Sequence, residues 1–405
     1  SVSGVSLTDP VIRFVDAQNT LDTAANTDIV TASVLSGGGT VSGATSTASS
    51  GVVTFTTLLY TATADQQAFV LSFADDTGGT NNFNSASTTA SSTVSDVVAT
   101  AIAFTTEPAN STSGIALVTQ PVITARDALG TTDTGFTETI TLTEASAGSL
   151  TNNTTSSVSG VATFVTLIYT ASADQQAFVL TASSSALTAV STSTTSNVVA
   201  TKIIVFTNPT SSVSGVSLTD PVIRFVDAQN TLDTAANTDI VTASVLSGGG
   251  TVSGATSTAS SGVVTFTTLL YTATADQQAF VLSFADDTGG TNNFNSASTT
   301  ASSTVSDVLA TKTIVFTNPT SSVSGVSLTD PVIRFVDAQN TLDTFANTDV
   351  VTAIVESGAG SVTNTTSTAS NGVATFTTLF YTATADQQAF VLRFADDTGG
   401  TNNFN

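Results

Sequence analysis

The stretch YTATADQQAFVL at residues 60–71 decides how this chain folds, because it occurs four times along the sequence. It returns with one changed residue at Tyr169 and unchanged at Tyr271 and Tyr381, and the chain has no tyrosine outside these four copies. Successive copies begin about 100 to 110 residues apart, which is the length of one small domain. The repeat therefore predicts four tandem domains.

A second shared phrase sets the domain boundaries. TDPVIRFVDAQNTLDT occurs around Pro10, Pro221 and Pro331, and QPVITARDALGTTDT around Pro121 is a diverged copy. Aligned on these prolines, the chain divides into four predicted domains, called repeats 1 to 4, at 1–98, 99–199, 200–308 and 309–405. Residues 1–97 are identical to 212–308, so repeats 1 and 3 must do the same job.

The two ends of the chain differ from its interior. Repeat 1 begins after the position where repeat 3 carries IIVFTNPTS, and repeat 4 stops before the STTASSTVSDV that closes repeats 1 and 3. We therefore expect repeat 1 to lack its first strand and repeat 4 its last. This pattern is typical of a window on a longer repetitive chain.

Within a repeat the apolar residues recur with a period of two, which indicates β-strands. Val53 and Phe55 alternate with Thr54 and Thr56, a pattern typical of a half-buried strand. The same alternation predicts an inward face in the following strand, formed by Phe69, Leu71 and Phe73. Turn-rich segments such as SGGGTVSG separate the strands. Several short strands per hundred residues, with no helical pattern, predict an all-β fold of antiparallel β-sandwiches.

The repeated phrase fits one corner of an immunoglobulin-like sandwich. That corner carries an Asp, an aromatic residue four positions later and an inward core residue two beyond, and Asp65, Phe69 and Leu71 have this spacing. Phe69 lacks the hydroxyl of a tyrosine corner. We expect packing, Asp65 and the two following glutamines to hold the turn, with the Tyr60 hydroxyl as a further donor.

Several ordered phrases resemble a known family. They are ATKIIVFTNP at the start of repeat 3, DPVIRFVDAQNT after it, NGVATFTTL in repeat 4 and AFVLTASSSALTAVS in repeat 2. They resemble the bacterial immunoglobulin-like (Ig-like) domains of large surface proteins, the kind found in invasin and intimin stalks and in giant repetitive adhesins. The resemblance covers all four repeats. It implies a secreted protein whose domains serve as spacers or fibres.

Composition excludes several classes of function. The 30 acidic against 7 basic residues give a net charge of −23, which repels nucleic acid. The chain has no His and no Cys, and its only lysines are Lys202 and Lys312. Ser-His and Cys-His catalysis are therefore excluded, and we expect no enzyme. No apolar run approaches the roughly 18 residues of a membrane span.

One segment carries candidate metal ligands. FADDTGGTNNFN is present in repeats 1, 3 and 4 and absent from repeat 2. Calcium prefers oxygen ligands from carboxylates, amides and backbone carbonyls. The candidates are Asp286, Asp287, Asn292 and Asn293, with equivalents Asp75, Asp76, Asn81 and Asn82. The alternative is a hairpin turn without a metal, since Asp and Asn favour turns. No cofactor is required in either case.

Tandem repetition predicts a structural role. The junctions SDVVATAIAFTTEP and SNVVATKIIVFTNP contain no flexible Gly/Ser linker, so we expect the four domains to form an elongated rod. The expected function is an extracellular fibre or stalk, and the expected partners are other copies or a continuation of the same repeat chain. The alternative is an adhesin region whose exposed loops bind a host or surface ligand. The identity of repeats 1 and 3, loops included, favours the fibre.

Overall fold

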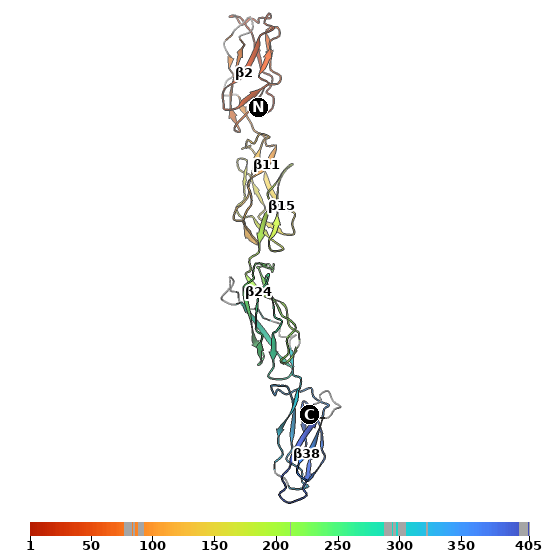
Figure 1. Ribbon diagram of the computed structural model, residues 1–405. Coiled ribbons are helices and arrows are strands. Elements are labelled where there is room, and N and C mark those ends of the chain that lie inside the picture. The colour runs from red at the N-terminus through yellow and green to blue at the C-terminus, as the bar shows by residue number, and fades with distance from the viewer. Residues whose placement is uncertain are drawn as a thin grey trace. The chain divides into compact units, whose positions relative to one another are not determined.

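Every regular element in the described part of the chain is a β-strand (Figure 1). The computed structural model describes residues 1–76, 83, 86–87, 93–210, 212–286, 294, 297–298, 305–320, 323–396 and 404. The chain divides into two compact units, Ser1–Val198 and Val199–Asn405. The first unit holds repeats 1 and 2, and the second holds repeats 3 and 4. Within the described residues no helix is present that could cross a bilayer.

Repeat 3 shows how the alternating sequence builds two layers. One antiparallel sheet has the strand order β24 (Lys202–Thr207), β26 (Val222–Val226) and β30 (Val263–Thr265). The other has the order β29 (Thr256–Thr258), β27 (Ile240–Ser247), β33 (Val281–Asp286) and β34 (Ala297–Ser298). Along β27, Val241 and Ala243 are buried while Thr242 and Ser244 are exposed. Side chains of period two therefore give each sheet one apolar face.

Short strands close the end of repeat 3 that contains the corner phrase. β28 (Thr251–Ser253) pairs with β31 (Leu270–Thr272). β35 (Val305–Asp307) lies between β32 (Gln278–Ala279), to which it is antiparallel, and β25 (Ser212–Val213), to which it is parallel. The chain thus folds as antiparallel Ig-like β-sandwiches, as the sequence predicts.

The other repeats are built from corresponding strands. Repeat 1 contains β1 (Val11–Arg13), β2 (Ile29–Ser36), β3 (Thr40–Ser42), β4 (Thr45–Thr47), β5 (Val52–Thr54), β6 (Leu59–Thr61), β7 (Gln67–Ala68), β8 (Val70–Asp75), β9 (Ala86–Ser87) and β10 (Val94–Ser95). Repeat 2 contains β11 (Ala101–Thr106), β12 (Ser111–Thr112), β13 (Ile115–Ala116), β14 (Val122–Arg126), β15 (Thr139–Glu144), β16 (Ser149–Thr151), β17 (Thr154–Ser156), β18 (Val161–Thr163), β19 (Ile168–Thr170), β20 (Gln176–Phe178), β21 (Leu180–Ser184), β22 (Leu187–Val190) and β23 (Thr194–Asn197). Repeat 4 contains β36 (Lys312–Thr317), β37 (Val332–Val336), β38 (Val350–Ser357), β39 (Ser361–Thr363), β40 (Thr366–Thr368), β41 (Val373–Thr375), β42 (Phe380–Thr382) and β43 (Val391–Asp396).

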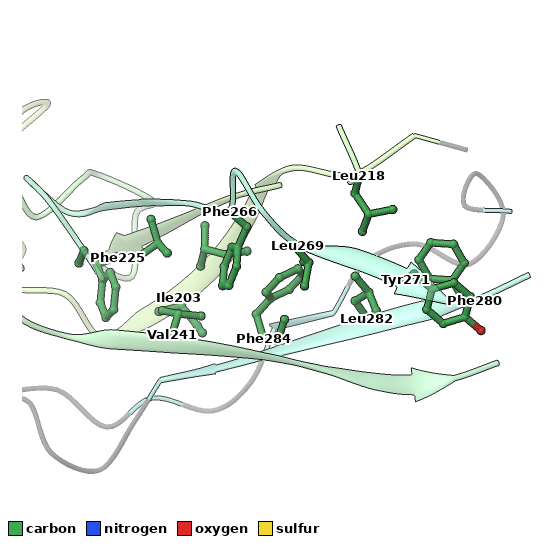
Figure 2. Close-up of a cluster of buried hydrophobic side chains, with 14 of the residues drawn as sticks. Ile203, Leu218, Phe225, Val241, Phe266, Leu269, Tyr271, Phe280, Leu282 and Phe284 are labelled. Atoms are coloured by element: carbon green, nitrogen blue, oxygen red, sulfur yellow. The ribbon is translucent and has the colours of Figure 1, made fainter. Parts of the chain in front are cut away.

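Four separate clusters of buried apolar side chains fill these sandwiches. One cluster lies within each predicted repeat. In repeat 3, side chains such as Phe225, Phe266 and Phe284 lie between the strands (Figure 2). The exact boundaries of the four repeats remain a prediction.

The inward and outward faces follow the sequence pattern with one departure. Val53 and Phe55 are buried and Thr54 is exposed in β5 and the residue after it. Val70 and Ser72 of β8, expected to face outward, are also buried. The equivalent Ser283 of β33 is only half-buried although its strand neighbours are the same, so position within the sheet does not account for the burial of Ser72.

The outermost strands differ between repeats. In repeat 1, β1 pairs with β5 alone, whereas β26 of repeat 3 pairs with both β24 and β30. Among the described residues of repeat 4 no strand occupies the position that β35 has in repeat 3. An open groove of about 1070 Å³, lined by residues that include Tyr381, Phe390 and Leu392, lies there instead.

Candidate functional site

The corner phrase packs its two aromatic residues against each other. In repeat 3, Tyr271 and Phe280 are stacked with ring centroids 4.0 Å apart and an angle of 9° between the planes (Figure 2). The three other repeats have the same stack, with centroid separations of 3.8 to 3.9 Å. Stacking of two buried rings adds to their burial energy. The repeated phrase therefore gives the same aromatic stack at every corner.

The tyrosine hydroxyl ties the corner to the backbone. The Tyr60 hydroxyl lies 2.7 Å from the carbonyl oxygen of Gly37 and 3.0 Å from Oε1 of Gln67. The same Gln67 oxygen accepts the backbone N–H of Thr63 at 2.9 Å. This confirms the expected hydroxyl donor. Burial raises the pKa of Tyr60, although a hydrogen bond from the Gly39 backbone opposes the rise.

A glycine makes room for each tyrosine. A Cβ atom at Gly39 would collide with the ring of Tyr60, and one at Gly250 would collide with Tyr271. The same holds for a third pair, Gly360 and Tyr381. The glycines in SGGG and SGAG are therefore required by the repeated tyrosine, a link between distant stretches of sequence.

The corner aspartate has a larger role than holding its own turn. Asp65 Oδ1 accepts hydrogen bonds from the backbone N–H groups of Gln66 at 2.8 Å and Val97 at 2.7 Å. Its other oxygen, Oδ2, accepts the backbone N–H of Thr134 at 3.0 Å and the Thr134 hydroxyl. Since Thr134 belongs to repeat 2, the carboxylate joins two neighbouring repeats.

The same joint recurs in the second unit. Asp276 Oδ1 accepts the N–H of Val308 at 2.8 Å, and Oδ2 accepts the N–H of Thr344 at 3.0 Å together with its hydroxyl. A second aspartate of repeat 4, Asp343, accepts the N–H of Ala310 at 3.0 Å. The segment between the two repeats is therefore held by one carboxylate from each side. We call this arrangement the junction clasp; in the first unit its members are Asp65, Val97, Ala99, Asp133 and Thr134.

The hydrogen bonds of the clasp favour the charged carboxylate. Partial burial alone would raise the pKa of Asp276, but the bonds from Thr344, Val308 and Gln277 outweigh it and hold the pKa below its usual value. The pKa of Asp65 is lowered in the same way. In contrast, partial burial and the nearby negative charge of Asp276 raise the pKa of Asp307.

The predicted calcium ligands are only partly within the described residues. Asp286 ends β33 and is 6% exposed, and one carboxylate oxygen lies 3.4 Å from the backbone nitrogen of Phe294. Asp75 ends β8, and Asp76 Oδ1 accepts the N–H of Ile29 at 3.3 Å. Asp287, Asn292, Asn293, Asn81 and Asn82 lie outside the described residues. Among the described residues no group of three or more His, Cys, Asp or Glu side chains could hold a metal ion.

Sequence reasoning missed two sets of residues. Thr134 and Thr344, the partners of the corner aspartates, sit in a turn that carried no recognised signal. Asp28, Asp239 and Asp349, each at most 1% exposed, also went unnoticed. The sequence did contain a signal for this second set. Each of the three aspartates directly precedes the apolar first residue of a strand, and repeat 2 has Glu138 at the equivalent position.

Comparison with solved structures gives matches among bacterial surface proteins. The chain is similar to FdeC, an adhesin of Escherichia coli, with 14% identity, 75% of this chain and 95% of that chain covered, and a TM-score of 0.33. It is similar to invasin, a bacterial integrin-binding protein, with 15% identity, 73% and 56% covered, and a TM-score of 0.30.

A third match is the surface layer protein SbsC, domains 4–9, with 15% identity, 78% and 44% covered, and a TM-score of 0.20. The chain spans about half the length of the invasin and SbsC chains. No protein-family model and no curated protein sequence matches it. At 14–15% identity these are likenesses of fold.

Proposed function

We propose that this chain is part of an extracellular structural protein that builds a surface fibre or stalk from tandem Ig-like domains, and that it is not an enzyme. The observation that carries the proposal is the junction clasp. Asp65 and Asp276 each bind a threonine of the following repeat through both its backbone and its side chain. Two donors from one residue to one carboxylate restrict rotation between neighbouring domains, because both bonds keep their geometry over a narrow range of orientations.

The sequence supports the proposal by repeating the residues of both halves of this joint. Every repeat has the corner aspartate, at Asp65, Asp174, Asp276 and Asp386. Every repeat also has the Asp-Thr pair of the opposite half, with threonines at Thr23, Thr134, Thr234 and Thr344. A module that carries both halves of one joint can be added to a chain any number of times. The partners that fit such a module are further copies or a continuation of the same repeat chain.

The second candidate is an adhesin region that binds a host or surface ligand through exposed loops. The observation in its favour is the set of apolar side chains exposed outside strands, such as Val118 at 77% and Phe345 at 66%. Val118 and Phe345 are each specific to one repeat, and neither lines one of the two described pockets of the chain. The identity of repeats 1 and 3 favours the fibre.

Immunogold electron microscopy with antibodies against this chain tests the proposal on native cells. The fibre predicts labels on extracellular filaments, at regular intervals close to the length of one or two domains. Labels on stalks that end in a distinct head would favour the adhesin. Labels confined to the cell interior would contradict both.

A further inference from the structure

Two aspartates meet on the inner face of the four-stranded sheet in repeat 1. Asp28 directly precedes β2, and Val30 of β2 pairs with Asp75 of β8. Residues two apart on a strand share a face, so Asp28 and Asp75 share the face on which Val30 is buried. Asp28 is only 1% exposed. Burial and the negative charge of Asp28 raise the pKa of Asp75, which shows that the two carboxyl groups are near each other.

This pair of acids lacks a visible counter-charge. A buried carboxylate costs free energy unless hydrogen bonds or an opposite charge compensate for its lost hydration. Among the described residues Asp28 Oδ1 has no hydrogen-bond partner. The one ion pair in the described part of the chain joins Arg393 and Glu356, which belong to repeat 4. Backbone hydrogen bonds from Phe83 and Asp76 favour the charged form of Asp75, so a proton or a cation is left to compensate for the unpartnered Asp28 oxygen and for the repulsion between the two carboxylates.

Repeat 2 shows what the same position looks like without the pair. Strand register makes Glu138 the equivalent of Asp28 and Ser184 the equivalent of Asp75. Glu138 is exposed, and β21 continues through a short turn into β22. Repeat 2 is also the repeat that lacks the FADDTGGTNNFN segment. Both aspartates and the segment are thus present together or absent together.

The pair recurs wherever the segment does. Its counterparts are Asp239 and Asp286 in repeat 3, which are 1% and 6% exposed, and Asp349 and Asp396 in repeat 4, which are 0% and 6% exposed. If Asp286 and its equivalents were present only because Asp favours turn conformations, a second, buried aspartate on the neighbouring strand would not be required. The correlation therefore indicates a ligand held between the two strands.

We propose that each of these aspartate pairs, Asp28–Asp75, Asp239–Asp286 and Asp349–Asp396, binds one Ca²⁺ ion. The donors are carboxylate oxygens, and the chain has no His or Cys, so a hard cation fits the site better than a transition metal. Ca²⁺ tolerates irregular arrangements of oxygen ligands, and backbone carbonyls or water complete its shell. The proposal keeps Asp286 from the sequence prediction and adds Asp239 as the second carboxylate.

A bound cation would join the start of one central strand to the end of its neighbour. In repeat 1 these strands are β2 and β8, and the Asp76 N–H donates to the Ile29 carbonyl oxygen at 2.9 Å directly beside the pair. The ion would neutralise the repulsion between the two carboxylates and link the strands where the segment begins. Each site would raise the stability of its own repeat.

Native mass spectrometry of the full chain, titrated with CaCl₂ after chelation, counts the bound ions. We expect three Ca²⁺ per chain at saturation, and a melting temperature raised by at least about 3 °C in the repeats that bind. Asp239→Asn should bind two ions, while Glu138→Gln in repeat 2 should still bind three. Circular dichroism checks that each variant is folded. Asp286→Ser, which installs the residue of repeat 2, gives a second variant with the same expected loss of one ion.

Two outcomes would overturn the proposal. If the parent chain binds no Ca²⁺ at millimolar concentration, and acidification alone stabilises it, the pairs share a proton. If Ca²⁺ binds equally to the parent, Asp239→Asn and Asp286→Ser in 150 mM salt, a concentration of about physiological ionic strength, the ions sit on the acidic surface.

Discussion

Repeats 3 and 4 have almost the same sequence, but their cores are not equally closed. In repeat 3, strand β35 covers the corner phrase, and Phe280 and Leu282 are 0% exposed. In repeat 4 the equivalent Phe390 and Leu392 are partly exposed, and Val391 is 54% exposed. The difference coincides with the groove at the position of β35.

The comparison separates what forms the sheets from what closes the core. Strands β27 and β33 pair in the same register as β38 and β43, with the same bulge near the end. The Tyr–Phe stack is also present in both repeats, at 4.0 Å and 3.8 Å. Pairing and stacking are therefore the same in both repeats. What differs is the exposure to water at one end of the sandwich, the end that β35 covers in repeat 3.

The largest expected difference between the two repeats comes from removing the stacked phenylalanine. Phe280→Ala should destabilise repeat 3 by about 3–5 kcal/mol, because the ring is fully buried and leaves a cavity. Phe390→Ala should destabilise repeat 4 by about 1–2 kcal/mol, because its ring already contacts water. Calorimetric unfolding of the full chain measures both. Equal losses would show that the groove is closed in solution.

A smaller difference is expected when the glycine beside the tyrosine is replaced. Gly250→Ala places a Cβ against the ring of Tyr271, and overpacking of this kind costs about 1–3 kcal/mol. Gly360→Ala makes the same collision with Tyr381, but Tyr381 borders the open groove and has room to shift. We expect the repeat 4 variant to lose less stability by thermal unfolding. A larger loss in repeat 4 would contradict the comparison.

Removing one hydrogen bond of the junction clasp between repeats 3 and 4 should change the free energy of unfolding less than either core substitution. Thr344→Val removes the hydroxyl that donates to Asp276 and keeps the size of the side chain. We expect the free energy of unfolding of repeat 4 to fall by about 1 kcal/mol. The two repeats should then unfold at more widely separated temperatures. Thr375→Val, at an exposed position of β41, is the matched control and should change little. An unchanged calorimetric profile for Thr344→Val would show that the clasp does not couple the repeats.

The smallest expected effect is the acid sensitivity of the clasp. The folded pKa of Asp276 is lowered, so its stabilising contribution is present above the unfolded value of about 3.9 and is lost as the pH falls through the folded pKa. The raised pKa of Asp307 acts in the opposite direction, since its protonation relieves repulsion from Asp276. We expect Asp307→Asn to raise stability at pH 7 and to lose this advantage below pH 4, roughly where aspartates protonate. Chemical unfolding at both pH values measures the change, and a constant difference between variant and parent would refute it.

Much of the sandwich could be predicted because its signals are local. Alternation in GVVTF shows which face of the strand is buried, and the spacing of Asp65, Phe69 and Leu71 identifies the corner. The burial of Val70 and Ser72 could not be read in this way, because alternation alone assigns both side chains to the outer face. Which residues cover a side chain depends on contacts far apart in sequence.

The junction clasp and the buried aspartates could not be predicted for a related reason. Asp65 and Thr134 are 69 positions apart, and nothing near either residue indicates that they meet. Asp28 and Asp75 become neighbours only through the register of β2 and β8. The sequence pointed to the Asp-rich segment because its candidate ligands lie within eight residues of one another, and it left out the aspartate on the other strand.

The parallel pairing of β25 with β35 has a mechanical consequence. One of these strands lies early in repeat 3 and the other lies at its end, and Ser212 pairs with Ser306. A tensile force on the chain draws two such strands in opposite directions along their length. Their hydrogen bonds are then loaded in shear and must fail together, whereas an unzipping geometry breaks them one at a time. Repeat 2 has the same arrangement in β12 and β23, so under tension both repeats would resist extension before their cores are exposed.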